Sequence, residues 1–222
     1  MSGDMRCLSI ECQYLLTLTI LRRNYDYLEA GYIFKISDDT VSMVFKTWLI
    51  FLYKKFGSKE WRDRLFVKFE DLPKPLPECF LEGGDILDKV RCVIDTTSIK
   101  IRRPKNYAKN GNTYSSYKSQ NVYNVLIAVL PTGTAAFISK PFEGCISDNQ
   151  LIEDSGILEY SDPGDRWLAD RGFTCHHLFA ERQCHLITPT FKDKEAESMS
   201  KKDIYKNQVI AKARIHIGTF YR

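Results

Sequence analysis

Two aspartates are the residues of this sequence best suited to do chemistry. Each comes directly after an apolar run, Asp95 after CVI at 92–94 and Asp170 after WLA at 167–169. Short apolar runs of this kind predict buried strands. A carboxylate in such a place is costly to desolvate unless it is paired or bound to a metal ion. If the two strands are neighbours in one sheet, Asp95 and Asp170 would hold a divalent cation between them.

The segment around and after the first aspartate is basic. Seven lysines and arginines fall between residues 91 and 118, against the single acid Asp95. A basic segment beside a candidate metal site suits a phosphodiester substrate, and Arg102, Arg103 and Lys118 are its candidate DNA contacts. A solvated loop rich in lysine and arginine is the alternative. The net charge of +4 permits a nucleic-acid partner but does not require one.

Cysteine and histidine residues form two small clusters, CHH at 175–177 and CH at 184–185. Their spacing matches no established zinc pattern, and adjacent residues on a strand point to opposite faces. We therefore interpret them as buried thiols and ordinary histidines rather than as a zinc site. The seven cysteines are odd in number and irregularly spaced, which argues against a disulfide framework and for a reducing compartment.

The apolar stretch at 14–21 is too short to span a membrane and contains two threonines. The residues before it do not form a convincing signal peptide. We expect an intracellular, soluble protein with no membrane partner.

Residues 1–71 are expected to form a small all-helical module. Helices are predicted over 13–21 and 27–34, and a third begins after Ser37, which is a good N-cap. Two helices joined by a three-residue turn outline a helix-turn-helix. Ser42 and Lys46 on the third helix would then face the DNA groove. A plain helical bundle packed on the next domain is the alternative.

Residues 72–90, rich in proline and ending near a glycine pair, are expected to link this module to a domain over 91–222. That domain is predicted to contain strands over 91–101, 123–130, 134–139, 166–169 and 184–188, and helices from Ser147, over 174–181 and over 200–217. The order is that of an α/β fold with an RNase H-like mixed sheet flanked by helices.

Several segments resemble one family. VIDTTSIKI at 93–101, the stretch from TYSSYKSQ to GCISD at 113–148, SGILEYSDPGDRWLADRGF at 155–173 and RIHI at 214–217 are similar to transposase-derived DDE superfamily endonucleases, which are related to Harbinger and insertion-sequence transposases. LLTLTILRRN at 15–24 and FKISDDTVSMVFKTWLIFLY at 34–53 resemble the helix-turn-helix that precedes the nuclease domain in that family.

The resemblance implies specific roles. Asp95, at the end of the first strand, and Asp170 would be the first and second metal-binding and catalytic aspartates, holding Mg²⁺ or Mn²⁺ for in-line attack on phosphorus. The family's third ligand is a glutamate that follows an Arg-Ile-His-(Val/Ile) sequence on the last helix. This sequence has Gly218 there and ends at Arg222, so we expect a C-terminally truncated nuclease domain.

Other acids are weaker candidates for the third ligand. Asp148 lies in a motif shared with the family, where it would either orient its helix or ligate a metal. Glu195 and Glu197 fall in a lysine-rich loop and are expected to be solvated. Lys35 stands where the family's turn often has glycine, so a turn that needs positive φ would be strained.

Two functions remain as hypotheses. In the first, the protein is a DDE endonuclease homologue, located in the nucleus, that binds divalent metal and DNA; whether it cuts DNA without the glutamate stays open. In the second, it is a non-catalytic DNA-binding or interaction protein derived from a transposase. DNA is the expected partner, and a homo-oligomer is compatible with either hypothesis.

Overall fold

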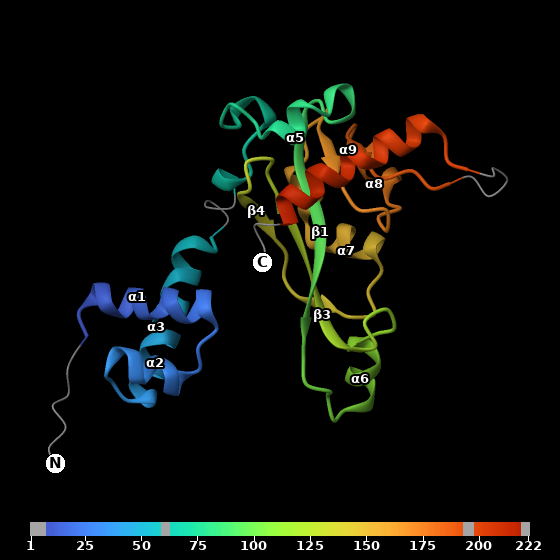
Figure 1. Ribbon diagram of the computed structural model, residues 1–222. Helices are drawn as coiled ribbons and strands as arrows, with labels where there is room; N and C mark the ends of the chain where they lie inside the picture. The colour runs from blue at the N-terminus through green and yellow to red at the C-terminus, as the bar shows by residue number, and fades with distance from the viewer. Residues whose placement is uncertain (1–7, 59–62, 193–197, 219–222) are drawn as a thin grey trace, which may run out of the picture. The chain divides into compact units, whose positions relative to one another are not determined.

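The computed structural model describes residues 8–58, 63–192 and 198–218 (Figure 1). Contacts between residues divide the chain into two compact units, which cover residues 1–62 and 63–222. No helix within the described ranges is long and apolar enough to cross a membrane.

The first unit is the expected helix-turn-helix module. It consists of α1 (Ile10–Arg23), α2 (Tyr27–Phe34) and α3 (Asp38–Phe56). Ser37 caps α3, because its Oγ accepts a hydrogen bond from the backbone N–H of Thr40 at 3.3 Å. The three helices share a small apolar core, in which Leu16 and Val41 are fully buried.

The turn between α2 and α3 carries the strain expected from its sequence. Lys35 adopts a left-handed conformation with φ 57° and ψ 43°. A residue that carries a Cβ pays a conformational free energy of roughly 1–2 kcal/mol in this left-handed region, which glycine does not. The turn is also tight, since a Cβ added at Gly31 would lie 2.8 Å from the carbonyl oxygen of Ile36. Lysine therefore occupies the position at which glycine would be relaxed.

The second unit contains the expected mixed sheet. Its strands are β1 (Val90–Lys100), β2 (Tyr114–Ser115), β3 (Gln120–Val129), β4 (Ala135–Ile138), β5 (Phe142–Glu143), β6 (Arg166–Leu168) and β7 (His185–Ile187). Their order is β2-β3-β1-β6-β7, and β4 and β5 also pair with β3. β3 runs antiparallel to β1, whereas β6 is parallel to β1 and β7 is parallel to β6. The α/β fold preceded by a helical module is thus confirmed.

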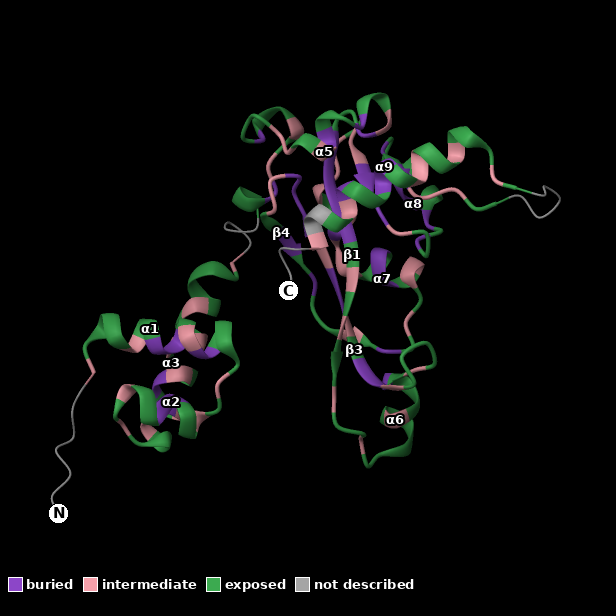
Figure 2. Cartoon of the chain, viewed as in Figure 1, coloured by how far each residue is buried: buried purple, intermediate pink, exposed green. Residues whose placement is uncertain are grey.

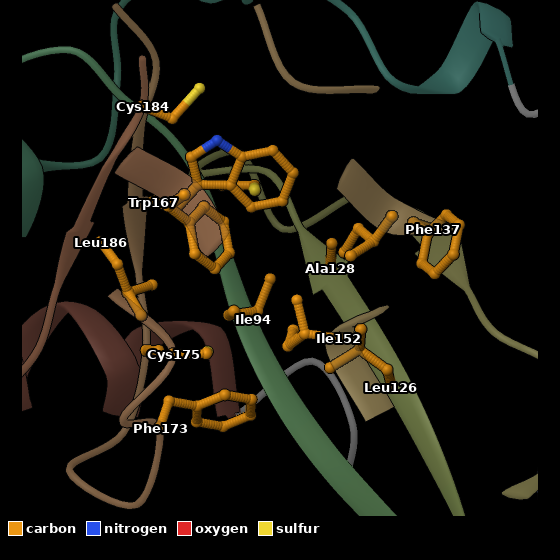
Figure 3. Packing of buried hydrophobic residues seen from close by; sticks show 14 of the residues in the cluster. Ile94, Leu126, Ala128, Phe137, Ile152, Trp167, Phe173, Cys175, Cys184 and Leu186 are labelled. Atoms are coloured by element: carbon orange, nitrogen blue, oxygen red, sulfur yellow. The ribbon is translucent and has the colours of Figure 1, made fainter. Parts of the chain in front are cut away.

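Helices cover both faces of this sheet. The second unit contains α5 (Glu78–Leu81), α6 (Tyr107–Thr113), α7 (Asp148–Ser155), α8 (His176–Glu181) and α9 (Lys201–Gly218), with 3₁₀ turns η1 (Phe69–Asp71), η2 (Gly84–Ile86) and η3 (Ile157–Tyr160). On one face Ile94 and Trp167 pack with residues of α7 and α8 (Figure 3). On the other face Val93 and Leu168 pack with residues of α9 and α5.

The segment 72–90 belongs to the second unit, where Leu72, Phe80 and Leu87 are buried in the two cores.

Cys175 and Cys184 are buried thiols of the α7–α8 core, as expected from the sequence. Burial raises the pKa of the Cys175 thiol to about 11.

One arginine of the basic segment 91–118, Arg91, is buried. Arg91 is only 3% exposed, and its guanidinium bonds to Asp162 at 2.9 Å and to Asp165. It also donates to the backbone carbonyls of Val67 at 2.9 Å and Phe66 at 3.2 Å. Arg91 therefore ties the sheet to neighbouring loops and does not contribute a surface charge for DNA.

Candidate metal site and nucleic-acid surface

Adjacent parallel strands bring the two aspartates to the same level of the sheet. The β1–β6 register pairs Val93 with Leu168, and Asp95 and Asp170 each lie two residues further along. Because side chains alternate along a strand, both carboxyl groups continue the face on which α9 packs. β1 extends five residues beyond Asp95, so this aspartate lies mid-strand and not at the strand end that the resemblance implied. Figure 2 shows that β1 is buried over its first half and half-buried to exposed over its second half.

Each carboxylate keeps one oxygen available for a ligand. The Oδ1 of Asp95 accepts from the backbone N–H of Thr96 at 2.9 Å. The Oδ1 of Asp170 accepts from the N–H of Arg171 at 2.6 Å and from Nη1 of Arg214 at 2.7 Å. Neither Oδ2 has a hydrogen bond to any residue in the described part of the chain. One free carboxylate oxygen on β1 and one just beyond the end of β6 are donors of the kind that Mg²⁺ and Mn²⁺ prefer.

The charges around Asp95 show that the site gathers both acidic and basic groups. Asp95 lies at the exposed part of β1, but partial desolvation of its carboxyl group raises its pKa above the usual range, and the negative charge of Asp170 adds to this effect. The backbone N–H of Thr96, Arg214 and Lys118 act in the opposite direction. Lys118, expected to touch a substrate phosphate, therefore lies close enough to the aspartates to influence them.

Asp148 approaches the same site from α7. It is the first residue of that helix, which Ser147 caps. Burial raises the pKa of Asp148, and the charges of Asp170 and Asp95 raise it further. Its Oδ2 lies 3.5 Å from where a Cβ of Gly172 would stand, in the turn that follows Asp170. Even so, within the described ranges no three His, Cys, Asp or Glu side chains converge closely enough to hold a metal ion.

One stripe of the last helix faces Asp170. Asn207, Ala211 and Arg214 of α9 line a cavity of about 560 Å³ together with Asp170 and other residues. Gly218 is four residues beyond Arg214, so it continues this stripe by one turn. A Cβ at Gly218 would meet nothing within 4 Å. Position 218, where the family's glutamate was expected, thus lies in line with the site but offers no carboxylate.

The remaining candidates are distributed over other surfaces. Glu195 and Glu197 lie outside the described residues. Arg102 and Arg103 are exposed beyond the end of β1, where they line a second groove. In the first unit, Lys46 is exposed and Ser42 half-buried on α3. The short helix α6 beside the second groove was not predicted from the sequence.

Removal of the Asp95 charge is expected to stabilise the protein when no divalent ion is present. The raised pKa means that the ionised carboxylate is disfavoured in the folded state, and Asp95→Asn removes that charge while keeping an acceptor for Thr96. The variant should melt at a higher temperature near neutral pH. The gain should shrink as pH falls through the raised pKa, where the wild-type carboxyl becomes neutral. Asp154→Asn on the exposed side of α7 is the control and should show no such pattern.

Comparison with known proteins matches both units of the chain. A family model described as DDE superfamily endonuclease matches residues 94–222, which is more than half of the chain. A model described as the helix-turn-helix of DDE superfamily endonuclease matches residues 6–58. No curated protein and no solved structure matches the chain.

Proposed function

Because the chain belongs to the DDE superfamily of endonucleases, we propose that it binds DNA and holds a divalent metal ion, Mg²⁺ or Mn²⁺, between Asp95 and Asp170. The observation that supports this proposal is the pairing of β1 with β6, because Asp95 and Asp170 each follow the paired residues Val93 and Leu168 by two positions. The charge of Asp170 also raises the pKa of Asp95, and each carboxylate keeps one oxygen without a hydrogen bond to the described residues. We further propose that cleavage of DNA by this site is weak, because Gly218 supplies no third carboxylate.

Different side chains at this site would bind the metal ion, position the neighbouring helix and bind the substrate phosphate. Asp95 and Asp170 would hold the cation, which when bound polarises a phosphate oxygen and lowers the pKa of bound water. Asp148 would hold its helix and the Gly172 turn in place and add negative charge behind the two ligands. Lys118 would hold a substrate phosphate near Asp95.

The helix-turn-helix would supply a separate contact with double-stranded DNA. In such modules the second helix of the motif enters the major groove. Here that helix is α3, whose exposed Lys46 and half-buried Ser42 would approach the DNA. The acidic start of α3 at Asp38 and Asp39 is a poor phosphate contact, so binding by this helix is expected to be modest.

One feature favours the second candidate function, a DNA-binding protein without catalysis. Arg214 forms an ion pair with Asp170 at 2.7 Å, and so occupies one oxygen of a proposed metal ligand. With this pair in place and glycine at 218, the site would bind DNA and metal without cutting.

Nicking of supercoiled plasmid in Mn²⁺ separates the two functions. The endonuclease proposal predicts slow nicking that disappears in Asp95→Asn, in Asp170→Asn and on addition of EDTA, while a gel-shift assay shows DNA binding unchanged by the substitutions. Asp154→Asn should nick like wild type. If the wild type nicks no faster than the double variant Asp95→Asn/Asp170→Asn but still binds DNA, the protein is a DNA-binding protein without catalysis. Nicking that persists in the double variant would contradict the assignment of the two aspartates.

A further inference from the structure

A second concave surface lies away from the aspartates, where the end of β1, α6 and the start of β3 meet. Its cavity measures about 750 Å³, and an adjoining cavity of about 300 Å³ shares Arg103, Tyr107 and Asn110 with it. Figure 1 shows α6 at the far end of the long β1–β3 ribbon, away from α5 and α9. We call this surface the finger groove and define it by Lys100, Arg102, Arg103, Tyr107 and Tyr114.

The charge of the finger groove fits a polyanion. Lys100, Arg102 and Arg103 line the larger cavity and Lys105 lines the smaller one, and no acidic side chain lines either. None of these four cations forms an ion pair with any residue that the structure describes. Cations that gather without counter-charges repel one another, so an anionic ligand would relieve that repulsion.

The aromatic residues in the groove distinguish nucleic acid from other polyanions. Tyr107 is 91% exposed and Tyr114 is 44% exposed, and both line the same cavity as the arginines. Exposed aromatic rings beside a basic track are the means by which proteins bind single strands, because each unpaired base can stack on a ring. In an intact duplex the bases already stack on one another and cannot use such a ring.

The finger groove is rigidly built. Asn121 of β3 is only 7% exposed, and its Nδ2 donates to the backbone oxygen of Asn110 at 2.9 Å and to Oγ1 of Thr113 at 2.9 Å. These bonds fix α6 against the sheet. Asn106 caps the start of α6 by accepting from the N–H of Lys109 at 3.1 Å. A surface held in this way needs little reordering when it binds a ligand.

The groove and the aspartate site lie along the same strand, β1. Lys100 lies five residues beyond Asp95 on the same strand, about 17 Å at ~3.3 Å per residue. Lys118, which acts on the pKa of Asp95, directly precedes Ser119 and Gln120, which line the groove. At ~3.4 Å per stacked nucleotide, this distance corresponds to about five nucleotides of a strand.

We propose that the finger groove binds a single strand of DNA about five nucleotides from the phosphate at Asp95, with an unpaired base stacked on Tyr107. This assignment rests on the proposed function, because it takes DNA to be the substrate. It adds that the protein prefers DNA whose strands are separated beside the site, such as a frayed or melted end. Arg102 and Arg103 hold the backbone of that strand, and Lys118 bridges to the aspartates.

The test measures binding of the full chain to fluorescently labelled dT₂₀ by anisotropy, over a range of salt concentrations. Arg102→Ala/Arg103→Ala should weaken binding at least tenfold and reduce the salt slope by about 1.4, at ~0.7 for each phosphate that the variant no longer neutralises. Tyr107→Ala should weaken binding about tenfold, within the range measured for stacked bases, and leave the salt slope unchanged. Binding to a blunt duplex through α3 should change little in either variant.

Matched controls come from α9. Lys201→Ala/Lys202→Ala removes two exposed charges, and Tyr205→Ala removes an exposed ring, and neither should change binding to dT₂₀. If the groove variants bind dT₂₀ as wild type does, the finger groove assignment fails while the proposed function stands. If wild type binds neither dT₂₀ nor duplex, the proposed function fails with it. Tighter, groove-dependent binding of rU₂₀ would assign the groove to RNA and overturn the DNA proposal.

Discussion

Gly218→Glu is expected to raise Mn²⁺-dependent nicking of plasmid DNA by at least about 10- to 100-fold. Substitution of a residue that only supports a metal ligand already lowers metal affinity or activity by about 10- to 100-fold, and a direct ligand is expected to matter at least as much. Position 218 continues the stripe of Asn207, Ala211 and Arg214 that leads to Asp170, and a side chain there has open space. A glutamate would give the site a third carboxylate and a charge for Arg214 to pair with, which would release Asp170 for the metal.

Three comparisons isolate the cause of this gain. Gly218→Gln has the same shape without the charge and should stay at the wild-type rate. Tyr205→Glu adds a carboxylate to an exposed position of α9 outside the stripe and should also have no effect. The gain should vanish when Asp95→Asn is added. An equal rise in the glutamine variant, or no rise in the glutamate variant although it folds and binds DNA, would refute this account of position 218.

Arg91→Met is expected to destabilise the protein by about 3–5 kcal/mol, the usual result when one partner of a buried ion pair is removed. Asp165, whose side chain is 10% exposed, would be left without its cation, and the carbonyls of Phe66 and Val67 would lose their donor. Methionine fills much of the volume of the arginine stem, so a cavity contributes little. Chemical denaturation measures the loss directly.

A second substitution should recover part of this loss. Arg91→Met/Asp165→Asn removes the stranded charge, so the double variant should be more stable than Arg91→Met alone. Asp165 also accepts from the backbone N–H of Asp162 at 2.8 Å, a bond that asparagine can keep. A cost below ~1 kcal/mol for Arg91→Met, or a double variant less stable than the single one, would mean that the buried charge is not the source of the effect.

Features carried by nearby residues could be predicted from the sequence. α2 has the predicted bounds, and α3 begins directly after Ser37 as expected, because caps and apolar spacing are local signals. The strand that contains Asp95 and the strand that precedes Asp170 were predicted for the same reason. Their adjacency was a condition of the metal-site hypothesis, and the β1–β6 pairing meets it.

Features that depend on distant partners could not be predicted. Arg91 reads as one more surface cation in the sequence, because its partners Asp162 and Asp165 are more than 70 residues away. The pairing of Arg214 with Asp170 across 44 residues was equally hidden. The helix α6 was missed because its sequence, YAKNGNT, has almost no apolar periodicity, and it is held instead by Asn106 and by Asn121 of β3.

Calorimetric titration of Mn²⁺ into the metal-free protein will show whether Asp95 and Asp170 together hold a divalent cation. We predict saturable binding in the wild type that is lost in Asp95→Asn and in Asp170→Asn but kept in Asp154→Asn. Binding should also weaken as pH falls, and at a higher pH than for an ordinary aspartate, since the raised pKa of Asp95 lets protons compete. Unchanged Mn²⁺ affinity in both Asp95→Asn and Asp170→Asn would show that these two aspartates do not hold the ion.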